Sequence, residues 1–267
     1  MDPENPLKDQ PVEPTVTDIP PCSQINDYLI GAKNANRLVY CRFGEKYVSD
    51  LEKRKNSNIS SLNAPNACLG SASYLINIRK LIEDHNIESE KKDFKSMKTV
   101  SMKRDNGQVQ PYYKLEGEND KTLLFESRFE SGNLLAAIKL SDNEYDLILQ
   151  NDINTNGHTQ WFFFRVANTR KGEKIKFNIL NLAKPDSLYN YGMKILSFSN
   201  TEKTKEDIGW HRVGEGINYY ANQFKRDCTG LVRYAKNFFT LTFSIKFNHD
   251  DDQQFFSHCF PYTYSDL

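Results

Sequence analysis

The chain has 267 residues, enough for one large domain or two small ones, and its 35 basic and 35 acidic side chains cancel to a formal net charge of zero. A neutral chain has no global field that attracts nucleic acid or anionic lipid, so we expect neither nucleic acid nor a membrane as a partner. The five cysteines are irregularly spaced and form no C-x-x-C, which excludes a secreted disulfide framework and a zinc knuckle. No apolar run approaches the roughly 18 residues that span a bilayer, and the proline-rich start has no signal-peptide core. We therefore expect a cytoplasmic protein.

The first 110 residues are expected to lie outside the main domain. Residues 1–21 are rich in proline and poor in large apolar side chains, so they bury too little surface to offset the entropy lost on ordering. Short apolar clusters at 28–30 and 38–40 can dock locally, and we predict an extended or disordered tail with docking segments over 1–70. In the next region, 71–110, apolar residues at helical spacing predict a helix over 72–88, and a basic stretch, 91–104, predicts a solvated linker.

From Lys121 onward the hydrophobic period changes to two, which indicates β-strands. The predicted strands are 122–126, 134–140, 145–150, 160–166, 174–182, 193–198 and 239–247. In 239–247 every second residue is apolar, which predicts one buried and one solvated face. Aromatic residues on both faces of 160–166 predict a central strand. Short strands without intervening helices favour a mainly β fold, an antiparallel β-sandwich over 111–267, preceded by one helix and the long N-terminal tail.

Candidate catalytic and metal-binding residues are few. His85 and Glu88 match H-x-x-E, but so short a match at the end of a predicted helix, without a third ligand, is better explained as an exposed helix end. The polar run 249–252 predicts a hairpin turn rather than a calcium loop. Cys259 follows His258, but neighbours in a strand point to opposite faces and cannot pair as nucleophile and base, so we expect a buried cysteine. We predict no catalytic residue, no metal ligand and no cofactor in this chain.

A series of motifs runs through the β-rich half in a recognisable order. It includes the segments 125–134, 145–152, 158–166, 189–193 and 258–267. The series closely resembles the N-terminal domain of the cytosolic carboxypeptidases, zinc enzymes that trim glutamates from tubulin tails and related acidic C-termini. The resemblance covers 120–267 and implies an antiparallel β-sandwich packed against a separate α/β catalytic domain. In that family the zinc ligands and the general base belong to the catalytic domain, so zinc is expected only if such a domain follows.

The matched motif residues are expected to have structural roles. Trp161 and Phe163 should supply core area on one face of their strand, and Arg165 should share that face and pair with a carboxylate. Gly192 should allow a bend with a positive φ. The complete set is Trp161, Phe163, Arg165, Tyr191, Gly192, Met193, Trp210, His258, Pro261, Tyr262 and Tyr264.

Two functions compete. The first is a non-catalytic binding or structural module, with tubulin, microtubules or other proteins of a large assembly as partner, in the cytoskeleton or a ciliary axoneme. The alternative is the N-terminal part of an active zinc metallocarboxypeptidase that removes glutamates from tubulin tails, with its catalytic domain beyond residue 267; the end of the sequence within a motif favours it. An enzyme using His85 and Glu88, and a generic carbohydrate- or peptide-binding sandwich, are weaker hypotheses. The basic linker is a second candidate for partner binding, through Lys91, Lys92, Lys95, Lys98, Lys103 and Arg104.

Overall fold

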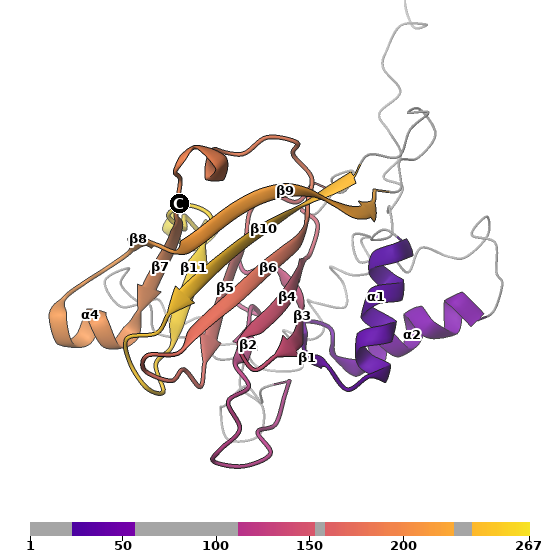
Figure 1. Ribbon diagram of the computed structural model, residues 1–267, viewed down its shortest axis with the longest axis horizontal. Helices are drawn as coiled ribbons and strands as arrows, with labels where there is room; N and C mark the ends of the chain where they lie inside the picture. Colours follow the sequence, from indigo (N-terminus) through magenta and orange to yellow (C-terminus); the bar gives the residue numbers. More distant parts are fainter. Residues whose placement is uncertain (1–22, 57–111, 153–157, 227–236) are drawn as a thin grey trace, which may run out of the picture.

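The computed structural model describes residues 23–56, 112–152, 158–226 and 237–267, which form two stacked β-sheets flanked by two N-terminal helices (Figure 1). The six-stranded sheet has the order β1 (Leu38–Cys41), β3 (Leu134–Ser141), β4 (Glu144–Leu149), β6 (Lys174–Leu182), β10 (Asn237–Lys246), β9 (Glu215–Lys225). The five-stranded sheet has the order β2 (Leu124–Glu126), β5 (Phe163–Ala167), β11 (Gln254–Ser257), β7 (Ile195–Ser199), β8 (His211–Val213). The mainly β sandwich expected from the sequence is confirmed.

Neighbouring strands are antiparallel with one exception. After β4 the chain leaves the six-stranded sheet, adds β5 to the other sheet, and returns as β6, which therefore runs parallel to β4. β5 lies between β2 and β11, so the prediction of a central strand is confirmed. The strand expected after the 249–252 turn is β11, whereas β8 and β9 were not predicted, because β8 is very short and β9 is an edge strand with mostly exposed side chains.

The core between the sheets is built from the inward-facing residues of both. On β10 these are Leu241, Phe243 and Ile245, each at most 3% exposed. The opposite face of β10 is less solvated than predicted, because Thr240 and Thr242 are also buried. Their hydroxyls have hydrogen-bond partners in the sheet, such as Asn178 for Thr242 at 2.8 Å, so burial leaves them satisfied.

Residues 23–56, expected within an extended tail, form instead α1 (Ser23–Asn34), β1 and α2 (Gly44–Asn56). The apolar residues of α1, among them Ile25 and Leu29, pack on the outer face of the six-stranded sheet, and β1 pairs with β3. Tyr28 donates a hydrogen bond of 2.6 Å from its hydroxyl to the carboxylate of Asp146 on β4. These residues are ordered because the sheet supplies the apolar partner that α1 lacks alone. The predicted helix 72–88 and linker 91–104 lie outside the described residues.

Three short helices complete the described part of the chain: α4 (Asn200–Glu206) and the 3-10 helices η1 (Leu188–Tyr191) and η2 (Tyr264–Asp266). Within the described ranges, no helix has the length and apolar character needed to cross a bilayer.

Candidate docking surface

The outer face of the five-stranded sheet carries a cluster of aromatic side chains. Phe163, Phe198 and Phe255 are nearly fully buried there. Three more rings cover them from the side of the solvent and are only partly buried: Phe129, Trp161 and Trp210. We call these six residues the aromatic face. No described helix packs on this cluster, so loop residues cover it in place of a second layer.

The loop that joins β2 to β3 holds Phe129 in place over the aromatic face. The ring centroid of Phe129 lies 4.9 Å from that of Phe163, in an edge-on arrangement that aromatic pairs prefer. Trp161 donates from its indole nitrogen to the carbonyl of Ser131 at 2.7 Å. Asn133 accepts from the backbone nitrogen of Phe163 at 3.0 Å. The loop is therefore fixed to the start of β5 by directed hydrogen bonds on both sides of its tip.

Arg42, which follows β1, connects the two ends of the same loop by hydrogen bonds. Its guanidinium donates to the carbonyl of Ser127 and, at 2.9 Å, to the carbonyl of Gly132. A Cβ at Gly132 would lie far inside van der Waals contact of the Ser127 carbonyl oxygen, so only glycine allows this close approach. The geometry of the loop therefore depends on the N-terminal strand as well as on its own residues.

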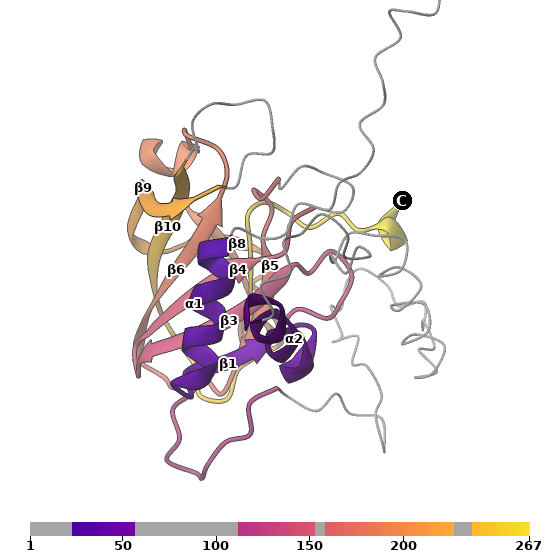
Figure 2. The same ribbon diagram turned by 90° about the vertical axis from the view of Figure 1, so that its right-hand side faces the viewer.

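The C-terminal segment extends the aromatic face with exposed apolar side chains. Tyr262, Tyr264 and Leu267 are 68%, 85% and 88% exposed. The segment is held at one point by the backbone nitrogen of Ser265, which donates to Glu130 of the β2–β3 loop at 2.9 Å. Figure 2 shows this end of the chain on the side of the five-stranded sheet, away from β9 and β10. Exposed rings thus lie beside the loop that carries Phe129.

Arg165 lies on the same face but does not form the ion pair that the sequence suggested. In the strand register it stands between Glu126 on β2 and Phe255 on β11, and side chains of paired residues project to one side of a sheet. Glu126 is instead bound by Arg128, with contacts of 2.9 Å to Oε1 and 2.6 Å to Oε2. Arg165 donates from Nη1 to the amide oxygen of Gln253 at 3.0 Å, and its Nε is buried without a hydrogen-bond partner.

This arrangement shifts the pKa values of Arg165 and Glu126. Burial lowers the pKa of the Arg165 guanidinium, and the Glu126 carboxylate opposes that effect only in part. Burial alone would raise the pKa of Glu126, but the hydrogen bonds and the charge of Arg128 bring it below its usual value. Glu126 is therefore ionised and already committed to Arg128. Among the described residues, Arg165 has no ion-pair partner.

His258 directly follows β11, where the C-terminal segment begins. Its Nδ1 shares a hydrogen bond of 2.9 Å with the hydroxyl of Tyr189, and its ring meets Phe162 edge-on. Burial, followed by the charges of Arg212 and Lys184, lowers the pKa of His258. Cys259 is exposed, which corrects the expectation of a buried cysteine. The reason is that β11 ends at Ser257, so the alternation of a strand no longer applies.

The remaining motif residues have separate places. Trp161 and Phe163 share one face, as predicted, but that face is the outer one rather than the core between the sheets. Tyr191 is 75% exposed, and Gly192 ends η1 with the predicted positive φ, 92°. Met193 packs against the main core, and Pro261 is buried. The sequence analysis missed Phe129, Phe198 and Phe255, whose signal was alternation within short strands and a motif loop.

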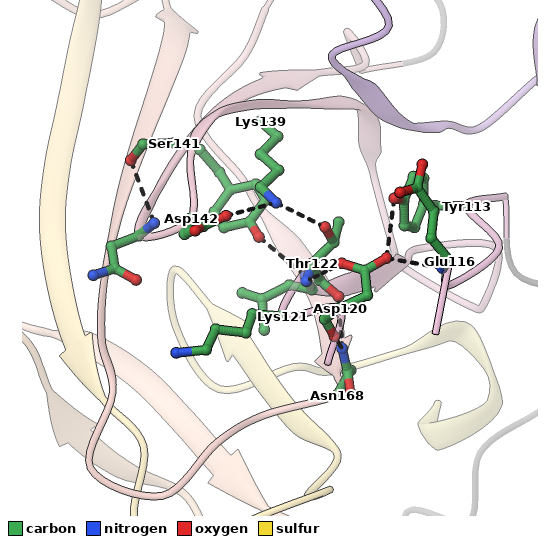
Figure 3. Close-up of polar contacts among 12 residues, drawn as sticks. Tyr113, Glu116, Asp120, Lys121, Thr122, Lys139, Ser141, Asp142 and Asn168 are labelled. Atoms are coloured by element: carbon green, nitrogen blue, oxygen red, sulfur yellow. Dashed lines mark hydrogen bonds and ion pairs between the residues drawn. The ribbon is translucent and has the colours of Figure 1, made fainter. Parts of the chain in front are cut away.

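A second polar cluster lies at the entry to β2 and acts as an anchor (Figure 3). Asp120 accepts hydrogen bonds from the hydroxyl of Tyr113 and the backbone of Thr122, and Asn168 donates to the carbonyls of Asp120 and Thr122. Burial raises the pKa of Asp120, but the hydrogen bonds from Thr122, Glu116 and Tyr113 outweigh it and lower the pKa to about 2. The bonds of Asp120 fold the segment 113–122 on itself and those of Asn168 tie it to the end of β5, so we assign the cluster a structural role.

Within the described ranges, no group of three or more His, Cys, Asp or Glu residues could hold a metal ion. The run 249–252 forms a turn but not the predicted hairpin, because it leads from β10 in the six-stranded sheet to β11 in the other sheet. Its Asp252 accepts hydrogen bonds from Ser199 and Thr201 at the start of α4. His85, Glu88 and the basic residues 91–104 lie outside the described residues.

Comparison with known proteins gives a consistent result over the sandwich. A family model described as the cytosolic carboxypeptidase N-terminal domain matches residues 125–258. Human cytosolic carboxypeptidase 2 is 49% identical over 153 residues, which are 57% of this chain and 16% of that protein. Mouse cytosolic carboxypeptidase 3 is 47% identical over 148 residues, 55% of this chain and 14% of that protein. This chain therefore matches only about one sixth of the length of these relatives.

Among solved structures, a metallo-carboxypeptidase from Pseudomonas aeruginosa covers 53% of this chain and 31% of its own length. The sequence identity is 17% and the TM-score 0.36, a superposition too loose to carry an argument.

Proposed function

The chain belongs to the family of the cytosolic carboxypeptidase N-terminal domain, and from that premise we propose that it is a non-catalytic module that docks onto another protein surface. The observation that carries the proposal is the exposure of Phe260, Tyr262 and Tyr264 on the C-terminal segment, which the hydrogen bond from Ser265 to Glu130 ties to the loop of the aromatic face. Folded domains rarely expose large apolar patches, and such a patch commonly marks an interaction site. Tyrosine and tryptophan also supply most of the strong anchor residues in protein interfaces.

The C-terminal segment of the docking surface is already ordered in the free chain, because hydrogen bonds hold it in place. Thr263 and Asp266 form a capping box around η2, which orients the segment between the two exposed tyrosines and the end of the chain. The hydrogen bond from Ser265 to Glu130 connects it to the β2–β3 loop. A surface that is ordered before binding loses less conformational entropy on docking, which favours affinity.

We propose a carboxypeptidase-type catalytic region as the docking partner. Support comes from the relatives, in which the segment similar to this chain is only about one sixth of a longer protein. The partner surface can be supplied by a separate chain or by the same polypeptide. The second case is the alternative function: the N-terminal part of an active zinc metallocarboxypeptidase that removes glutamates from tubulin tails. Zinc would then be held by the catalytic region.

A binding measurement tests the docking proposal. The 267-residue chain would be titrated with human cytosolic carboxypeptidase 2 from which the similar segment has been removed. Replacing Tyr262 and Tyr264 together by serine should raise Kd at least about tenfold, since a loss of about 1.4 kcal/mol has that effect. Tyr191→Ser is the matched control, because Tyr191 is 75% exposed but lies on η1, outside both the C-terminal segment and the aromatic face. Equal Kd values for the wild type and the double variant, or no binding at all, would contradict the proposal.

A narrower proposal is that the assembly belongs to the microtubule cytoskeleton, as the family resemblance implies. We expect microtubule co-sedimentation to depend on residues 1–110, which include Lys91, Lys92 and Lys95, more than on the sandwich. Undiminished co-sedimentation after deletion of 1–110 would count against this part.

A further inference from the structure

We propose that Arg165 is the site at which the docking surface binds a carboxylate of its protein partner. This inference rests on the proposed docking function and adds the chemistry of the partner: an apolar patch with one Asp or Glu side chain at the position of Arg165. The row Glu126, Arg165, Phe255 and Phe198 crosses four strands on one face, so the guanidinium lies directly beside the aromatic face.

The charges of the ionised side chains around Arg165 do not balance. Two guanidinium groups, those of Arg128 and Arg165, lie beside one carboxylate, that of Glu126, so these three side chains together carry a net charge of +1. Arg128 holds Glu126 through Nε and Nη2, which donate side by side to the two carboxylate oxygens in the bidentate geometry that matches a carboxylate best. Glu126 therefore cannot also serve Arg165.

The guanidinium of Arg165 is partly buried. Arg165 has only intermediate exposure, its Nε is shielded from solvent without a partner, and its one described hydrogen bond goes to the neutral amide of Gln253. A cation that has lost much of its hydration and gained no counter-charge destabilises the free domain. Such a residue is retained more readily where a partner supplies the missing charge.

The surroundings of Arg165 determine which kind of anion it can bind. A single uncompensated positive charge is matched by one monoanion, and Glu126 beside it disfavours a dianion such as a phosphate group. The planar guanidinium recognises a carboxylate oxygen with good geometry, and Phe255, the cross-strand neighbour of Arg165, helps to exclude water from the contact. These features select a carboxylate presented by an apolar protein surface.

A comparison of two arginines in the full chain tests the energetic part. Arg165→Met should leave the thermal midpoint unchanged or raise it, because it removes an uncompensated cation. Arg128→Met should lower the midpoint, because it leaves Glu126 buried without its partner. If Arg165→Met lowers the midpoint as much as Arg128→Met does, Arg165 is a structural residue and the inference is overturned.

A small probe tests the chemistry without any partner protein. Phenylacetate carries a ring and a carboxylate, and phenylacetamide is its neutral counterpart. In a chain labelled with ¹⁵N-arginine, phenylacetate should shift the side-chain signal of Arg165 saturably, and phenylacetamide should not. The signal is identified by its loss in Arg165→Lys. Equal shifts with both compounds, or none with either, would overturn the inference.

Binding to the truncated human cytosolic carboxypeptidase 2 separates the two proposals. Arg165→Met should weaken binding and reduce its dependence on salt. If the variant with serine at both Tyr262 and Tyr264 weakens binding but Arg165→Met does not, docking stands and the role of Arg165 fails. If neither change affects binding, the docking function itself fails.

Discussion

Replacing Gly132 by alanine should destabilise the sandwich through the β2–β3 loop. The added Cβ would meet the carbonyl group of Ser127 and approach its Oγ to 3.0 Å, and the carbonyl cannot retreat freely because Arg42 also binds it. Backbone must therefore move, and inserting one carbon into a closely packed site typically costs about 1–3 kcal/mol. For a domain of this size each kcal/mol lowers the thermal midpoint by about 2–4 °C.

Urea unfolding followed by tryptophan fluorescence measures this effect. The chain has two tryptophans, Trp161 and Trp210, and both lie in the aromatic face, so their emission reports the region that the substitution disturbs. Gly117→Ala is the matched control, because an added Cβ there meets nothing within 4 Å and the free energy of unfolding should not change. An unaltered free energy of unfolding for Gly132→Ala would refute the close approach of the loop to Ser127.

Three further substitutions test the core, the N-terminal helix and the half-buried His258. Phe177→Ala, at a fully buried site between the sheets, should lower the free energy of unfolding by about 3–5 kcal/mol, as measured in urea. Tyr28→Phe removes the hydrogen bond from α1 to the buried Asp146 and should cost about 1–3 kcal/mol; an unchanged urea midpoint would show that this contact does not fasten α1. The pKa of His258 is lowered on folding, so its contribution is complete above the unfolded value of about 6.5 and is lost as the pH falls below it. Between about pH 7.5 and about pH 5.5 the wild type should therefore lose stability that His258→Gln retains, and parallel losses would exclude His258 as the cause.

Local pattern determined much of the fold. Residues that alternate between apolar and polar can bury one face only as a strand, and for that reason the seven predicted strands correspond to β2, β3, β4, β5, β6, β7 and β10. The order of motifs over 125–258 identified the family, because each motif reflects a packing requirement that the fold imposes.

The tertiary structure decided which strands share a sheet and which segments join them. The apolar clusters 28–30 and 38–40 were recognised as docking segments, which the structure confirms, but not as parts of a helix and a strand. The stability of those two elements comes from contact with β3 and β4, far away in the sequence. The same holds for the aromatic face, whose rings come from β5, β7, β11 and three loops.

The docking surface shows the division between sequence and structure most clearly. Alternation along β5 placed Trp161, Phe163 and Arg165 on one face, and the structure agrees. It could not show that Glu126, the carboxylate nearest to Arg165, is already held by Arg128, because an ion pair depends on the path of a loop and on the distances it sets. Sequence by itself determined the strands, the family and the kinds of side chain available; only the packing of the two sheets and the β2–β3 loop decided which charge is left without a partner.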